Sequence, residues 1–180
     1  MISRGNRRAD LFFVERDYRF YLELLGEALE RFGVECHGYC LMPNHVHLLL
    51  DGAADAISKT MQRVNGRYAQ WFNREYGYVG HVFQGRFIGI PIEDDGQLLE
   101  LARYIANNPV RAGICETAAE WPWSSFAATL GDSPTPRFLA TEWLLDQFGS
   151  DRAAARKALR AFAQERVWKP PPRRSPLGVG

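Results

Sequence analysis

Two histidines separated by one residue, His45 and His47, are the side chains of this 180-residue sequence best suited to chemistry. In an extended strand, residues two apart point to the same face, with β-carbons roughly 7 Å apart. Two imidazoles at that spacing can bind one divalent metal ion, while Val46 between them points into a core. The alternative interpretation is that both are polar residues on the solvated face of a strand, because His-x-His is a common spacing.

A tyrosine and an asparagine form the second candidate group. The spacing of the apolar residues predicts a helix over 95–107, with Tyr104 on the flank of its apolar stripe. Asn108 follows four residues later, so its amide can lie one turn away from the phenol. Amide oxygens are suitable ligands for Mg²⁺ or Mn²⁺. A tyrosine in this position can equally serve packing, with its hydroxyl in water.

The charge of the chain is distributed unevenly. In total, 22 basic and 21 acidic residues give a net charge of +1, and this sum alone does not indicate a nucleic-acid partner. Residues 1–8, however, hold three arginines and no acid, residues 56–92 hold five basic residues and one acid, and residues 166–174 hold four basic residues. Such local patches decide where a polyanion docks. Three aromatic residues near the second patch are candidates for stacking on bases: Tyr76, Tyr78 and Phe83.

The pattern of apolar residues predicts an α+β fold. Its elements follow the order β-α-β-β-α-β and then a further helix, which is the split βαβ (ferredoxin-like) arrangement of an antiparallel sheet with helices on one face. A mainly helical extension follows, with helices near 141–148 and 151–166. The expected strands are 2–5, 34–42, 45–50 and 81–92, and the expected helices are 17–32, 56–75 and 95–107.

Several function classes are disfavoured. No run of 18 apolar residues predicts a membrane span, and no apolar segment of a signal peptide follows the N-terminus, so we expect a cytoplasmic protein. Cys36, Cys40 and Cys115 are too few and wrongly spaced for a disulfide framework or a four-ligand zinc site. The sequence contains no glycine-rich phosphate loop and no Gly-x-Ser-x-Gly motif.

Five segments, taken together, resemble a known family. They are Ser3–Arg8, Tyr39–Leu49, Gly80–Phe87, Tyr104–Gly113 and Trp123–Phe126. In this order they resemble the single-tyrosine HUH transposases of the insertion-sequence-200 class, and most nearly the branch of REP-associated tyrosine transposases. The resemblance covers residues 1–126 well and the remainder loosely.

The resemblance implies a metal-dependent endonuclease and strand transferase that cleaves single-stranded DNA next to hairpins through a 5′-phosphotyrosine intermediate. Tyr104 matches the nucleophile of that family. His45, His47 and Asn108 match its metal ligands, with Mg²⁺ or Mn²⁺ as the expected cofactor. The implied partner is a REP-like palindrome flanked by a guide tetranucleotide. A hairpin-binding regulator with the same fold and no strand transfer is the alternative.

The residues expected to contact DNA combine the basic patches with positions in the matching segments. They are Arg4, Arg7, Lys59, Arg63, Arg67, Arg86 and Arg111. We expect residues 1–115 to form the HUH nuclease domain, residues 116–168 the helical extension, and residues 169–180 a flexible tail rich in proline and arginine. A monomer and a homodimer are both compatible with the sequence.

Overall fold

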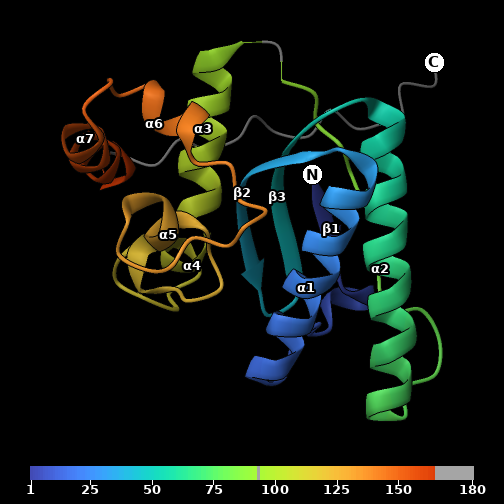
Figure 1. The fold of residues 1–180 in the computed structure, drawn as a ribbon. Helices are drawn as coiled ribbons and strands as arrows, with labels where there is room; N and C mark the ends of the chain where they lie inside the picture. Colours follow the sequence, from blue (N-terminus) through green and yellow to red (C-terminus); the bar gives the residue numbers. More distant parts are fainter. Residues whose placement is uncertain (93, 165–180) are drawn as a thin grey trace, which may run out of the picture.

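A three-stranded antiparallel sheet lies at the centre of the computed structural model, which describes residues 1–92 and 94–164 (Figure 1). The strand order is β1–β3–β2. Strand β2 (Glu35–Met42) turns directly into β3 (His45–Asp51), and β1 (Ile2–Arg4) pairs with the other edge of β3. The α+β class and the antiparallel sheet are therefore confirmed. The predicted tail over 169–180 and the basic stretch 166–174 lie outside the described residues.

Helices α1 (Glu15–Phe32) and α2 (Ala54–Tyr76) cover one face of the sheet. Both helices have apolar residues at helical spacing, and both end at a glycine in the left-handed conformation, which a residue with a β-carbon adopts at a cost. Their buried side chains pack on alternate residues of β2 and β3. This core includes Tyr21, Leu25, Met61, Val64 and Tyr68 from the helices and Tyr39, Leu41, Val46 and Leu48 from the strands.

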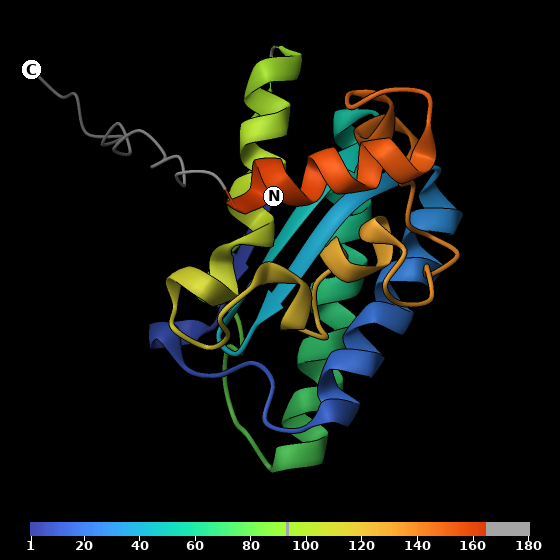
Figure 2. The same ribbon diagram turned by 90° about the vertical axis from the view of Figure 1, so that its left-hand side faces the viewer.

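Helix α3 (Asp95–Ala106) lies on the opposite face of the sheet, and the short helix α4 (Asn108–Arg111) follows it (Figures 1 and 2). The expectation that the helices share one face is wrong for α3. The physical reason is that the other alternate set of strand residues is also apolar, and Cys40, Met42 and Leu49 form a second core with Ile105. The predicted interruption at Asn108-Pro109 is confirmed.

The strand expected over 81–92 is absent from the described residues. This segment instead runs beside β1 and makes two isolated bridges, Ile2–Ile88 and Gly5–Phe83. A continuous ladder fails because β1 has only three residues, and because Gly85, Gly89 and Pro91 disfavour regular strand geometry. The sheet thus has three strands where the sequence predicted four.

Residues 116–164 pack against the free edge of β2 and against α3 (Figure 2). The Leu41 N–H donates to the Trp123 carbonyl (2.9 Å), and the Tyr39 N–H donates to the Ser125 hydroxyl (2.9 Å). Trp123 also stacks on Tyr18 of α1. Four helical segments complete this part: η2 (Ala118–Glu120), α5 (Phe126–Leu130), α6 (Glu142–Asp146) and α7 (Arg152–Gln164). Within the described residues, no helix is long and apolar enough to cross a membrane.

Helix α7 holds α3 from the side away from the sheet. The Asn107 side chain donates to the Ala163 carbonyl (2.9 Å) and to the Arg103 carbonyl (3.0 Å). The Arg103 guanidinium lies 4.6 Å from the centre of the Phe162 ring. Because α3 has its sheet contacts on one side and α7 on the other, the C-terminal part of the chain fixes the position of α3.

Replacing Asn107 with alanine should lower the free energy of unfolding by about 1 to 2 kcal/mol, because the buried Ala163 carbonyl loses the Asn107 side chain as a donor, while the Arg103 carbonyl keeps the backbone N–H of residue 107. Urea unfolding measures this loss. Asn73→Ala is the matched control, since its side chain donates to a carbonyl at an exposed position, and it should cost clearly less. If both variants lost the same free energy of unfolding, the hydrogen bond from Asn107 to α7 would not stabilise the position of α3.

Candidate active site

The structure brings His45, His47 and Tyr104 together between the start of β3 and the end of α3. The two imidazole rings lie 4.9 Å apart, centre to centre, and nearly perpendicular. The His47 ring lies 5.7 Å from the Tyr104 ring, again in an edge-on arrangement. Arg4 is the partner of His45 in the β1–β3 ladder, so its side chain belongs to the same face of the sheet.

Both histidines are held in the neutral form. Burial lowers the pKa of His47 to about 3, with a smaller contribution from His45, and burial together with the charge of Arg4 lowers the pKa of His45 to about 4. The His47 side chain is only 2% exposed, and its Nε2 atom has no hydrogen-bond partner among the described residues. A buried polar atom without a partner costs free energy unless a ligand satisfies it.

Asn44 orients the first histidine. Its side-chain oxygen lies 2.7 Å from His45 Nδ1, so the imidazole proton resides on Nδ1 and the lone pair on Nε2. The Asn44 amide nitrogen in turn donates to the Arg8 carbonyl (3.2 Å). Hydrogen bonds of this kind fix the tautomer of histidines that bind metals. The prediction missed Asn44, although its place in the turn just before His45 is a usable signal.

The end of α3 arranges three further side chains. Asn108 donates from its amide nitrogen to the Tyr104 carbonyl (2.9 Å), which leaves its oxygen as the atom suited to binding a ligand. The change of direction into α4 brings Arg111 back toward Tyr104, and the guanidinium carbon lies 4.8 Å from the centre of the phenol ring. The contact of Asn108 with residue 104 is thus to its backbone carbonyl, and the predicted approach of the Asn108 amide to the phenol stays a prediction. The Arg111 cation beside the phenol ring is a neighbour that the helical spacing alone did not place.

The imidazoles of His45 and His47 can hold one divalent cation that takes its other ligands from outside this pair. The described residues contain no group of three or more His, Cys, Asp or Glu side chains that could hold a metal. Imidazole nitrogen is a softer ligand than the oxygen atoms that Mg²⁺ and Mn²⁺ prefer, so the remaining ligands of such an ion would be oxygen atoms from water, from phosphate and from the Asn108 amide. The unpartnered Nε2 of His47 is the feature that such an ion would satisfy.

The residues expected to bind DNA divide into two groups. Arg4 and Arg111 lie beside the histidines and Tyr104, while Arg7 and Arg86 are exposed on the two segments that flank this edge of the sheet. The second group lies on α2, across the sheet from α3, and the structure does not bring it to the site. It consists of Lys59, Arg63 and Arg67, which line a shallow groove with Arg31.

Ion pairs reduce the free charge of this α2 surface. Lys59 pairs with Asp55 (3.1 Å), and Arg67 pairs with Glu27 of α1 (2.5 Å). Arg63 pairs with no carboxylate in the described part of the chain. A phosphate that docks on this groove would therefore meet Arg63 and Arg31 as the charges without a carboxylate partner in the described part of the chain.

Arg63→Ala should weaken hairpin binding and reduce the slope of log K against log salt by about 0.9, the value for one lost phosphate contact on duplex DNA. Arg67→Ala should have a smaller effect, since Glu27 already compensates this charge. Fluorescence anisotropy titrations at several salt concentrations measure both slopes. If the slope of log K against log salt is unchanged in Arg63→Ala, this face of α2 does not contact DNA.

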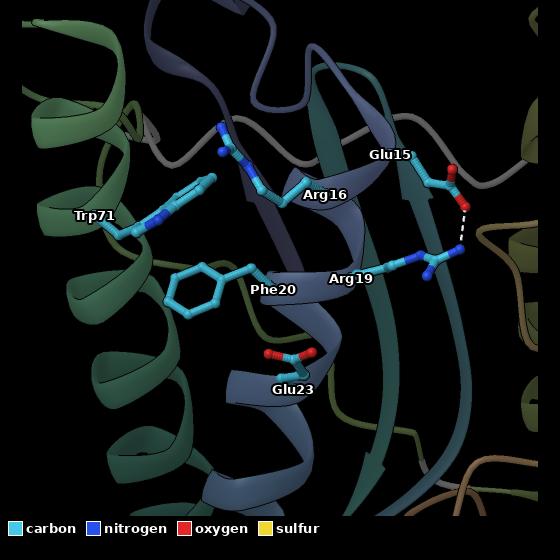
Figure 3. Close-up of a pocket in the computed structure, with 6 residues that line it drawn as sticks. All are labelled: Glu15, Arg16, Arg19, Phe20, Glu23 and Trp71. Atoms are coloured by element: carbon cyan, nitrogen blue, oxygen red, sulfur yellow. Dashed lines mark hydrogen bonds and ion pairs between the residues drawn. The ribbon is translucent and has the colours of Figure 1, made fainter.

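A second groove lies between α1 and α2 (Figure 3). Its wall carries Phe20 packed on Trp71, with ring centres 4.7 Å apart, and Arg16 lies 5.7 Å from the Trp71 ring. The Arg16 guanidinium is also paired with Glu75 (2.5 Å). These charged and aromatic groups satisfy one another, and the groove is on the face of the sheet away from His47.

Comparisons with known proteins are consistent with this geometry. Residues 1–108 match the family model described as IS200-like transposase. A Haemophilus influenzae protein described as a candidate REP-associated tyrosine transposase is 33% identical over 112 residues, which are 56% of this chain. The match spans 63% of that relative, less than two thirds of its length.

A solved structure of a REP-associated tyrosine transposase bound to a REP hairpin has the same fold. The TM-score is 0.60 at 20% sequence identity, and the match covers 77% of this chain and 81% of that chain. Identity at this level establishes a shared fold.

Proposed function

The chain belongs to the family of IS200-like transposases, and from this premise we propose that it is a metal-dependent nuclease and strand transferase for single-stranded DNA beside REP-type hairpins. One observation carries the proposal. The neutral His47 imidazole, whose Nε2 has no hydrogen-bond partner among the described residues, lies 5.7 Å from the Tyr104 ring, which supports a metal ligand and a nucleophile in one small site.

The proposed reaction is a transesterification. The Tyr104 oxygen attacks phosphorus in line, its proton is lost, and the bond to the 3′-oxygen breaks. The products are a 5′-phosphotyrosine and a 3′-hydroxyl, which takes up a proton. Because the phosphodiester energy is kept in the new bond, a second 3′-hydroxyl can attack the phosphotyrosine and reseal a strand without ATP.

Each residue of the site has a role in this scheme. His45, His47 and Asn108 would hold Mg²⁺ or Mn²⁺, which supplies positive charge to the phosphate oxygens when bound. Arg111 packs over the Tyr104 ring, restricts its orientation, and adds positive charge where the phenol loses its proton. Asn44 keeps the His45 Nε2 lone pair available for the metal.

The proposed DNA partner is a short palindromic hairpin with an adjoining guide tetranucleotide, and the proposed location is the cytoplasm. The REP hairpin bound to the structurally similar transposase supports the hairpin as partner, and the guide tetranucleotide rests on the sequence resemblance. His45, His47 and Tyr104 come together within one chain, which supports a monomer as the cleaving species, and a homodimer is the alternative. Analytical ultracentrifugation with and without hairpin DNA separates a monomer from a homodimer.

A labelled hairpin oligonucleotide with single-stranded flanks, incubated with the protein and Mn²⁺ or Mg²⁺, should give a covalent protein–DNA band on a denaturing gel. Chelation of the metal should remove the band. Binding of the same oligonucleotides without any adduct, across both metals, would support the alternative function of a hairpin-binding regulator.

A further inference from the structure

Two aromatic side chains form an exposed surface at the end of the molecule where β3 begins. Phe13 is 55% exposed and Tyr78 is 42% exposed, although both rings contact Phe72, at 5.4 and 5.8 Å between centres. We call Phe13 and Tyr78 the end platform. Of the aromatic residues that the sequence suggested for base stacking, Tyr76 and Phe83 pack against the core, so only Tyr78 is available.

Buried contacts fix the position of the end platform. The buried Asp17 carboxylate accepts the Phe13 N–H (2.7 Å) and the Tyr76 hydroxyl (2.7 Å), which ties the start of α1 to the end of α2. The Tyr76 ring meets Phe13 edge-on at 4.9 Å. These contacts fix the backbone and the inner edges of the rings while large parts of the rings face solvent.

A strained loop links the end platform to the active site. In η1 (Asn6–Arg8), Arg7 and Arg8 both have positive φ, 52° and 63°, which is uncommon for residues other than glycine. The Asn6 N–H donates to the Val82 carbonyl (2.8 Å), and Asn44 donates to the Arg8 carbonyl. The loop therefore touches the segment after Tyr78 on one side and the turn before His45 on the other.

The same loop supplies positive charge. Arg7 and Arg8 are exposed, and neither pairs with a carboxylate in the described part of the chain. The loop is tightly packed, since a β-carbon on Gly5 would lie 2.0 Å from the Ala9 carbonyl oxygen. Backbone strain of this kind is found most often at ligand-binding sites, so the strained conformation of Arg7 and Arg8 indicates that they bind a ligand.

We propose that unpaired nucleotides of the DNA leave the active site across Arg7 and Arg8 and stack on Phe13 and Tyr78. This inference deepens the proposed function and rests on it. Cations followed by exposed aromatic rings match the repeating phosphates and bases of a single strand. A base-paired stem is a poorer match, because its base faces are stacked and cannot pack on the rings. An apolar protein partner is also a poorer match, because it offers no negative charge to Arg7 and Arg8.

The test compares Phe13→Ala/Tyr78→Ala with the unchanged protein. Anisotropy titrations use two labelled hairpins of identical stem, one blunt and one carrying a thymidine extension of about eight nucleotides. Affinity for the extended hairpin should fall about tenfold or more, while affinity for the blunt hairpin stays the same.

Two control variants separate stacking from general surface effects. Phe13→Tyr/Tyr78→Phe keeps both ring faces and should bind the extended hairpin like the unchanged protein. Val79→Ala removes a neighbouring apolar side chain that is 94% exposed and should also leave affinity unchanged. Arg7→Ala should lower affinity for the extended hairpin and reduce its salt dependence.

The outcomes distinguish this inference from the proposed function. If the unchanged protein forms the covalent adduct but Phe13→Ala/Tyr78→Ala binds the extended hairpin normally, the end platform is not a stacking surface and the proposed function stands. Equal losses for blunt and extended hairpins would also overturn the inference, since the rings would then only support the fold. Absence of both adduct and binding in the unchanged protein would overturn both.

Discussion

Tyr104→Phe should reduce covalent adduct formation to background while leaving hairpin affinity unchanged. The variant removes only the hydroxyl oxygen, and that oxygen is the atom proposed to bond to phosphorus. The ring remains, so its contacts with His47 and the Arg111 guanidinium are kept. A denaturing gel measures the adduct, and anisotropy in the presence of a chelator measures binding.

The matched control for this experiment is Tyr78→Phe, which removes a hydroxyl from a partly exposed tyrosine of the end platform while keeping its ring. It should form adduct at the normal rate. If Tyr104→Phe still formed an adduct of unchanged yield, another nucleophile would carry the reaction and the assignment of Tyr104 would be wrong. A loss of hairpin affinity along with the adduct would mean that the hydroxyl serves binding instead.

His47→Gln should lower metal-dependent cleavage by more than about a hundredfold, because one of the two proposed imidazole ligands is lost and few other protein ligands are proposed. Glutamine fills much of the same volume, so the fold should persist. Calorimetric titration with Mn²⁺ should show weaker binding in the absence of DNA as well. The readout therefore does not depend on catalysis alone.

His37→Gln is the matched control for this variant. His37 is also a buried histidine in the sheet, on β2, and its Nδ1 lies 3.4 Å from the Ala140 carbonyl, so it does not belong to the site. This variant should bind Mn²⁺ normally. Normal cleavage and normal Mn²⁺ affinity in His47→Gln would show that the buried imidazole is a packing residue.

The low pKa values of the two histidines have a consequence for pH dependence. An ordinary imidazole, with a pKa near 6.5, loses most of its neutral, metal-binding form as the pH falls from about 7.5 to about 5.5. Since burial keeps the pKa of His45 near 4 and that of His47 near 3, both remain neutral down to about pH 5. Mn²⁺ affinity should therefore change little between pH 8 and pH 6.

Much of the fold followed from local patterns. Apolar periodicity placed α1, α2 and α3 to within about two residues, and two short apolar runs around Pro43-Asn44 predicted β2 and β3. The pairing of His45 and His47 on one face is a direct result of the two-residue period of a strand. The contact between Asn108 and Tyr104 likewise reflects a separation of four residues.

Other features depended on contacts between residues distant in the sequence. The spacing of apolar residues predicts that a helix has an apolar side, but it does not predict on which face of the sheet that side packs. The placement of α3 opposite α2 therefore separated the basic residues of α2 from Tyr104. The segment over 81–92 failed to become a strand because its partner, β1, is too short and its own glycines and proline disfavour a ladder.

The candidate active site can be divided in the same way. Residue types and spacing selected His45, His47, Tyr104 and Asn108 as candidates, because each pair lies within one strand or at one helix end. The isolation of His47 Nε2 and the position of Arg111 over the phenol ring required the packing of α3 on the sheet and the change of direction into α4. Two further features depend on contacts between residues more than 50 positions apart. They are the hydrogen bond from Asn107 to α7 and the packing of the Phe13 ring on Phe72. Local periodicity fixes which residues share a face, and only long-range packing decides what that face meets.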